Sequence, residues 1–281
     1  MARILLVPDS FKGSASSSEI SEWLENGILQ SELSQSESFN CEIIKVAIAD
    51  GGEGSLDSVL SAGFISHTFS VTGPVGNKVE ARIGVKGDIA IVELAEASGL
   101  SQLPEKKLSP LHATSFGTGE LILRALDLGA KRVILAVGGS ACTDAGAGAL
   151  QALGGHLLDT DGAEIPRGGA ALSQCATIDL TNLDSRLSST KFILASDVDN
   201  PLLGPKGAAA IYAPQKGANA SDVALLEAAL MNFADVAGTS HVRTAGSGRV
   251  SAVSVMNWPP FCDDHSRSGC VTSRLGITET C

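Results

Sequence analysis

The sequence has few aromatic residues and fewer basic than acidic ones. Aromatic side chains make up 4% of the 281 residues against 44% hydrophobic residues, so Leu, Ile, Val and Ala must fill the core. Twenty Lys and Arg against 31 Asp and Glu give a formal net charge of −11. An acidic surface repels nucleic acid and anionic lipid, so we expect neither as a partner. An anionic polyphosphate would need local cations, backbone N–H groups or a metal.

Cysteine pairs at metal-binding spacing and membrane-length segments are also missing. The six cysteines form no C-x-x-C, so the sequence predicts neither a zinc site nor a disulfide framework. No apolar run is long enough to span a membrane. The apolar run 4–7 is too short for a signal peptide and is ended by Pro8-Asp9. We therefore expect a cytoplasmic protein.

Two nucleotide-binding fingerprints are absent as well. The pattern G-x-x-x-x-G-K-[ST] occurs nowhere in the chain, and no G-x-G-x-x-G follows the first predicted strand. The second absence argues against an oxidoreductase on a similar scaffold.

What is present predicts an α/β fold. Apolar runs at 4–7 and 43–49 are each followed by a loop and a helical pattern, which is the rhythm of a parallel sheet. The first helix opens on Ser16-x-x-Glu19, typical of a capping box. Its predicted buried face consists of Ile20, Trp23, Leu24 and Ile28.

From about residue 68 the pattern changes. Strand-like runs at 79–85 and 89–94 are separated by Lys86-Gly87-Asp88, a good hairpin turn, and predict a second, mixed α/β domain. Further elements are predicted as helices at 55–60, 121–128, 146–153 and 221–236, the last capped by Ser221, and as strands at 133–137 and 192–195.

Five loops rich in Gly, acids or hydroxyls follow predicted strands or open predicted helices, where open α/β sheets bind ligands. The first, 8–14, offers Asp9, Ser10 and Lys12 before a helix N-terminus. The second, 49–55, offers two carboxylates, Asp50 and Glu53, as oxygen ligands for Mg²⁺. Ordinary surface turns are the alternative for both.

The third and fourth loops resemble phosphate cradles. Their candidate residues are Thr114, Ser115, Gly117 and Thr118 in the third, and Gly138, Gly139, Ser140 and Asp144 in the fourth. A well-capped helix start is the alternative for the third. Cys142 is interpreted as a small buried hydrophobe rather than a nucleophile.

The fifth loop follows the strand at 192–195. Asp197, Asp199 and Asn200 would orient a hydroxylated substrate or a metal, and Lys216 would add positive charge. The alternative is an Asx-type turn with solvated lysines.

In combination these segments resemble the glycerate kinase type-1 family. The matching runs are Asp9-Ser-Phe-Lys-Gly-Ser, Ala49-Asp-Gly-Gly-Glu-Gly, Val92-Glu-Leu-Ala-Glu-Ala-Ser-Gly-Leu100, Thr114-Ser-Phe-Gly-Thr-Gly-Glu-Leu, Gly138-Gly-Ser-Ala-x-x-Asp-x-Gly-Ala-Gly, Asp197-Val-Asp-Asn-Pro-Leu and Pro214-Gln-Lys-Gly-Ala. At one position the family's usual Asn-Asp-Gly-Gly reads Thr143-Asp144-Ala145-Gly146.

The resemblance implies a Rossmann-like parallel domain interrupted by a second α/β domain, with residues 1–70 in the first and 71–240 in the inserted one. It also implies phosphorylation of glycerate by ATP and favours the 2-position, as phosphoryl transfer without a covalent intermediate. Lys12 and Lys216 would then bind the substrate carboxylate or phosphate, Asp50 and Glu53 would hold Mg²⁺, and Asp197 or Asp199 would act as base or orient hydroxyls. The two cradles would donate N–H groups to phosphates. The oligomeric state stays open.

The segment 241–281 does not resemble the family beyond Gly248. Its apolar residues follow neither the helical nor the strand period. One hypothesis is that it replaces the return to the first domain because the reading frame has shifted. The chain would then be a C-terminally truncated kinase, poorly stable or inactive. The alternative to an active kinase is a remnant that at most binds a nucleotide or a sugar acid.

Overall fold

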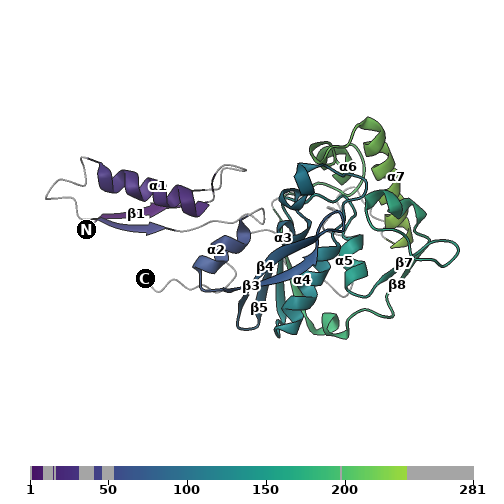
Figure 1. Ribbon diagram of the computed structural model, residues 1–281, viewed down its shortest axis with the longest axis horizontal. Coiled ribbons are helices and arrows are strands. Elements are labelled where there is room, and N and C mark those ends of the chain that lie inside the picture. The colour runs from purple at the N-terminus through teal and green to yellow at the C-terminus, as the bar shows by residue number, and fades with distance from the viewer. Residues whose placement is uncertain are drawn as a thin grey trace.

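The computed structural model describes residues 2–8, 15, 17–31, 41–45, 54–196 and 198–238. Its first unit consists of β1 (Ala2–Leu6), α1 (Ser17–Gln30) and β2 (Cys41–Lys45), which lie together at one end of the molecule (Figure 1). The two strands pair in parallel, with Ile4 opposite Ile43. The predicted strand–helix–strand order is therefore confirmed, as parallel neighbours joined by a helix.

The predicted buried face of α1 is wrong in part. Ile20 is buried, but Trp23 is 60% exposed and Leu24 is 45% exposed. Within the described ranges β1 pairs only with β2, so α1 has a sheet of two strands to cover. Such a narrow sheet covers only part of a helix, whatever the periodicity of the helix.

A five-stranded mixed sheet is the centre of the larger unit. Its order is β3 (Ile65–Thr72), β4 (Lys78–Lys86), β5 (Ile89–Glu93), β6 (Arg132–Ala136) and β9 (Lys191–Ala195). The first three strands are antiparallel neighbours, and β5, β6 and β9 are parallel. The predicted hairpin of 79–94 is confirmed as β4 and β5. The predicted domain boundary near residue 70 falls inside β3, which pairs along its length with β4.

The strand side chains alternate between two buried faces. On one face Val92, Val133 and Leu135 pack with α4 (Phe116–Asp127) in the main hydrophobic cluster. On the other face Ile91 and Ile134 pack with Leu56 of α2 (Ser55–Ser61). Parallel strands covered on both faces read as continuous apolar runs, which is why β6 was recognisable in the sequence.

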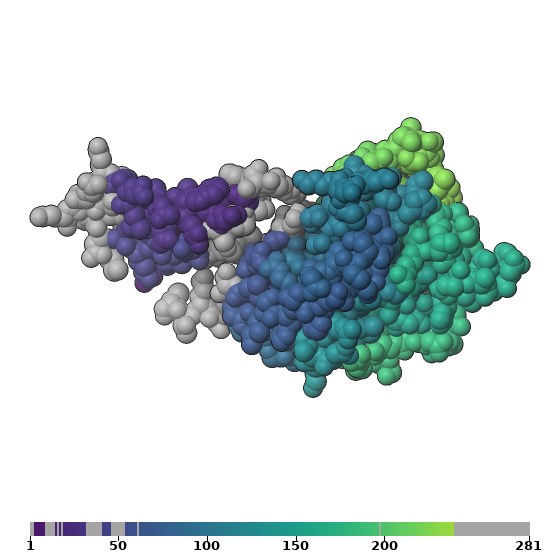
Figure 2. Space-filling model, in the orientation of Figure 1, coloured from purple at the N-terminus to yellow at the C-terminus, as the bar shows by residue number. Residues whose placement is uncertain are grey.

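The remaining elements form a second packed layer beside the sheet (Figure 1). They are α5 (Ala147–Ala152), β7 (His156–Leu158), β8 (Thr177–Asp179), α6 (Ala208–Tyr212) and α7 (Ala220–Val236). Leu226, Leu230 and Phe233 of α7 are buried in their common cluster. Helix α3 (Leu94–Ser98) belongs instead to the main cluster, through Ala97. Figure 2 shows the later part of the described chain, in green to yellow-green, gathered at the end of the molecule opposite the purple α1 unit.

The helix boundaries differ from two predictions. Helix α4 begins at Phe116, five residues before the predicted start, and so includes residues assigned to a loop. The cap of α7 is Asn219, not Ser221, because the Asn219 side chain accepts the N–H groups of Ser221 and Asp222. Asp222 in turn accepts the N–H of Asn219, completing a capping box.

Candidate functional site

Three loops meet where the parallel strands end. Glu93, Ala136 and Ala195 are aligned across β5, β6 and β9, so the segments after them leave the sheet at the same edge. The segments after β5 and β6 contact each other directly: the Leu100 N–H donates to the Gly139 carbonyl over 3.0 Å. In open α/β sheets this edge is where ligands bind.

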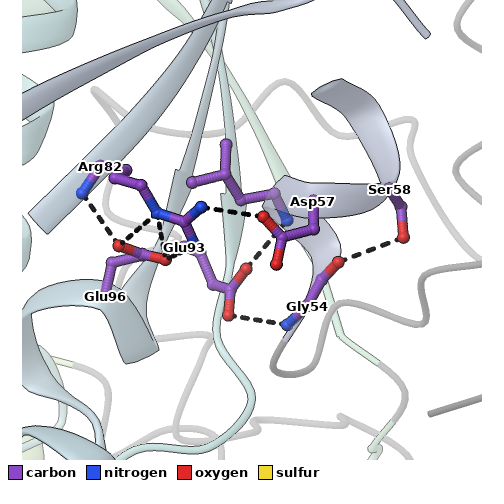
Figure 3. Close-up of polar contacts among 7 residues, drawn as sticks. Gly54, Asp57, Ser58, Arg82, Glu93 and Glu96 are labelled. Atoms are coloured by element: carbon purple, nitrogen blue, oxygen red, sulfur yellow. Dashed lines mark hydrogen bonds and ion pairs between the residues drawn. The ribbon is translucent and has the colours of Figure 1, made fainter. Parts of the chain in front are cut away.

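A buried carboxylate stands at the end of β5 (Figure 3). Glu93 is 3% exposed and accepts the N–H of Gly54 over 3.0 Å and that of Leu56 over 2.9 Å. Burial raises the pKa of Glu93 to about 7, although the two N–H donors oppose this shift. Beside it, Arg82 forms ion pairs with Glu96 at 2.6 Å and Asp57 at 2.9 Å.

A buried ammonium stands behind the loop that follows β6. Lys216 is 5% exposed, and its Nζ donates to Ser140 Oγ over 2.9 Å and to the carbonyl of Cys142. Burial lowers the pKa of Lys216. Gly139 is exposed, and Gly138 and Ser140 are half-buried. An ammonium held this way polarises the Ser140 hydroxyl and places positive potential behind an open glycine turn, an arrangement suited to an anion.

Asp144 joins the third and fourth predicted loops. It is 2% exposed, and its Oδ2 accepts the N–H and the hydroxyl of Ser115 over 2.8 and 2.9 Å. The same oxygen accepts the Gly148 N–H over 3.3 Å and lies 3.4 Å from Thr114 Oγ1. Asp144 therefore joins the N-terminal ends of α4 and α5, where the helix dipoles favour a negative charge.

The third loop is packed within the protein. Thr118 is fully buried and donates to Ser98 Oγ over 2.9 Å. A Cβ on Gly117 would overlap the Thr72 carbonyl, and one on Gly148 would overlap Thr114 Oγ1. These glycines are required for close packing of α4. Ala145, at the position of a family glycine, adopts φ 50, a conformation that favours Gly.

The fifth loop is held by an interaction that the sequence did not reveal. Asn200 donates to the Lys206 carbonyl over 2.9 Å and accepts the Tyr212 hydroxyl over 2.5 Å. Asp199 beside it is exposed. Asn200 thus shapes the loop after β9 through its own side chain.

The structure brings two groups of predicted residues together, Lys216 with Ser140, and Asp144 with Thr114 and Ser115. Asp9, Ser10, Lys12, Asp50, Glu53 and Asp197 lie outside the described residues. Among the residues that the structure describes, no group of three His, Cys, Asp or Glu side chains is arranged to hold a metal ion. Sequence reasoning missed Glu93 and Tyr212 as site residues. Glu93 had a signal, since it ends an apolar strand and belongs to the matching run 92–100.

The fold and this edge define an α/β protein of the kind that binds ligands beyond the carboxyl ends of parallel strands. The chain belongs to the glycerate kinase family, whose sequence model matches residues 4–252. The family resemblance and the α/β class inferred from the sequence are therefore confirmed.

Individual relatives agree. The chain is 48% identical over 254 residues to a glycerate kinase of Bacillus subtilis (strain 168), covering 88% of this chain and 65% of that protein. It is 44% identical over 239 residues to the glycerate 2-kinase of Escherichia coli (strain K12), covering 83% of this chain and 61% of the relative. A crystal structure assigned to a glycerate kinase 2 from Salmonella typhimurium LT2 superposes with a TM-score of 0.73 at 40% identity, covering 85% and 63% of the two chains.

The chain therefore spans less than two thirds of the length of these relatives. None of the helices in the described ranges is long and apolar enough to cross a bilayer.

Proposed function

We propose that this chain carries out the ATP-dependent phosphorylation of glycerate, in the cytoplasm and at the 2-position. Family membership and the names of the relatives support the reaction, and the name of the Escherichia coli relative supports the position. The single observation that carries the proposal in this chain is the buried Lys216 behind the open Gly138–Ser140 turn.

The reaction needs positioning and charge neutralisation more than covalent chemistry. A glycerate hydroxyl oxygen bonds to the γ-phosphorus of ATP, the bond from that phosphorus to the β-bridging oxygen breaks, and ADP leaves. The hydroxyl proton passes to a base, for which Asp197 and Asp199 are our candidates. Lys12 and Lys216 are our candidates to bind the substrate carboxylate or phosphate.

Phosphate oxygens fit the donors at the edge after β6, namely the Ser140 hydroxyl and the backbone N–H groups of the exposed turn. We assign Asp50 and Glu53 as the ligands of Mg²⁺, because carboxylate oxygens are its preferred protein ligands. When bound, the ion would neutralise charge on the phosphates. The division into residues 1–70, 71–240 and 241–281 stays our working proposal, with the second unit refined to begin before β3.

The test is an ADP-release assay with D-glycerate on the wild-type chain and on Lys216→Met. We expect wild-type turnover that depends on D-glycerate, and a KM for D-glycerate about 10–100-fold higher in the variant, since a charge-assisted hydrogen bond is lost. Lys191→Met, at an exposed site on β9, controls for the loss of one positive charge. ³¹P NMR of the product identifies the phosphorylated oxygen.

If the wild-type chain binds ATP but releases no ADP with D-glycerate, the alternative of a binding remnant holds instead. An unchanged KM in Lys216→Met beside an active wild type would remove Lys216 from the substrate site without removing the reaction.

A further inference from the structure

Glu93 connects two elements that are far apart in the sequence. It is the last residue of β5, yet both of its carboxylate oxygens bond to the start of α2, which precedes it by more than thirty residues (Figure 3). Its Oε1 accepts from Gly54 and its Oε2 from Leu56. Two bonds from one rigid carboxylate fix the direction as well as the distance of the helix start.

The N-cap residue of α2 is a glycine, which has no side chain with which to cap the helix. This residue, Gly54, adopts φ 94 and makes no side-chain cap hydrogen bond. A local Ser, Thr, Asp or Asn would satisfy the free N–H groups without linking the helix to anything else. Glu93 does the same from the sheet, so capping and docking of α2 are one interaction. Leu56, directly beneath, is fully buried against the sheet.

Through α3, Glu93 is also connected to the loop that follows β6. Helix α3 begins at the next residue, and the Ser98 carbonyl at its end accepts the Ala141 N–H over 2.9 Å. The Leu100 N–H donates to the Gly139 carbonyl. These two bonds flank Ser140, which accepts from Lys216. Movement of the Glu93 end of α3 would therefore be passed to the Gly139–Ala141 turn.

This arrangement is unfavourable for the carboxylate itself. Glu93 forms no ion pair within the described part of the chain, and the acidic Glu96 and Asp57 lie close enough to disfavour its charge. Arg82, the nearby cation, is held by those two residues. A buried charge without a partner lowers stability, so its presence at a ligand-binding edge indicates that its position matters.

We propose that Glu93 is a positioning residue of the kinase site, holding α2 and α3 at the carboxyl end of β5 so that the Gly139–Ala141 turn keeps its geometry. This inference rests on the proposed function. Glu93 touches neither substrate in this role, and acts through the backbone of its neighbours.

The experiment compares the wild-type chain with Glu93→Gln, whose amide offers one acceptor oxygen for two N–H donors. Glu93→Asp is the second variant, because a side chain shorter by one methylene cannot reach both donors. Asp88→Asn is the matched control: it removes a carboxylate next to the opposite end of β5, where an exposed Asp88 pairs with Arg132. Steady-state kinetics, thermal unfolding and amide exchange at Gly54 and Leu56 are measured for each protein.

We expect both Glu93 variants to exchange these amides faster and to lose about 100-fold in kcat/KM, the cost of misplacing groups by about 1 Å. The loss should include a higher KM for ATP, whose phosphates the turn would bind, and a smaller folded fraction alone would not produce that change. Asp88→Asn should match the wild type.

Faster amide exchange in Glu93→Gln with unchanged kinetic constants would overturn the proposal and leave Glu93 as a cap. If Glu93→Gln does not fold, Glu93→Asp decides the question by the same criterion. An inactive wild type would defeat the proposed function, and this inference with it. The two failures can be told apart. If only the role of Glu93 is wrong, the wild type is active and the Glu93 variant is equally active.

Discussion

Two side chains of opposite charge are buried at the same edge of the sheet. Burying each charge away from water is unfavourable for the stability of the fold. Burial raises the pKa of Glu93 and lowers that of Lys216, so each is driven toward its neutral form. Neither forms an ion pair among the described residues. Hydrogen bonds from Gly54 and Leu56 hold the first, and the bonds from Lys216 to Ser140 and Cys142 hold the second.

The raised pKa of Glu93 predicts a pH dependence of stability. Between the ordinary value of 4.5 and about 7, the folded chain binds more protons at this carboxyl than the unfolded chain does. The contribution of Glu93 to the free energy of unfolding is therefore greatest below 4.5, falls as pH rises, and is lost above about 7. The difference between the two values corresponds to roughly 3 kcal/mol.

Urea unfolding at several pH values checks this expectation. The wild-type free energy of unfolding should fall relative to that of Glu93→Gln as pH rises across this window. Other titrating groups cancel in the difference between the two proteins. Parallel profiles would contradict the assignment of the shift to Glu93.

At the scale of elements, glycine decides how closely α4 packs. Gly117 meets the Thr72 backbone of β3, and Gly119 meets the Ala149 backbone of α5. In the sequence both glycines belonged to a motif resembling a phosphate cradle. A glycine in the sequence is compatible both with close packing of backbones and with a ligand that approaches the backbone. The sequence therefore could not distinguish these two roles.

We expect Gly117→Ala to destabilise the protein by about 3 kcal/mol, because the new methyl group meets backbone that cannot move aside. Gly27→Ala is the matched control. It lies within α1 with open space around it, so Ala should stabilise that helix by about 0.5–1 kcal/mol. Denaturant unfolding of both variants measures the two effects, and a neutral Gly117→Ala would show that α4 can shift.

At the scale of the whole molecule, burial is uneven. The four hydrophobic clusters of the described residues all lie between Leu56 and Val236. On the first unit, Leu5 is 60% exposed, Trp23 60% and Leu29 55%. A helix that buries only a small part of its surface unfolds locally more readily than a helix enclosed in a core.

Hydrogen exchange on the intact chain tests this difference. Amides of α1 should exchange at least about tenfold faster than those of α4 and α7, whose apolar faces are enclosed. The helices serve as controls for one another in one experiment. Equal protection would show that α1 is covered by a surface beyond the contacts described.

Much of the fold could be predicted because it depends on local pattern. Strand β6 was predicted from a continuous apolar run, and the β4–β5 hairpin from the turn at Gly87. Helix α5 was predicted from small residues that follow a glycine-rich turn. Strand β3 was missed, since its alternation around His67 and Thr68 is weak without its partner β4 in view. The face of α1 was wrong because periodicity shows which residues align, not whether anything covers them.

The sequence by itself determined the family, the α/β class and the approximate order of strands and helices, since these follow from local propensity, apolar periodicity and ordered motifs. Only the tertiary structure decided what the polar residues do. Asp144 joins the starts of α4 and α5, Lys216 supports Ser140 from a buried position, and Glu93 links α2 to β5. These roles depend on distances between residues 29 to 76 positions apart in the chain, and such distances are set by packing.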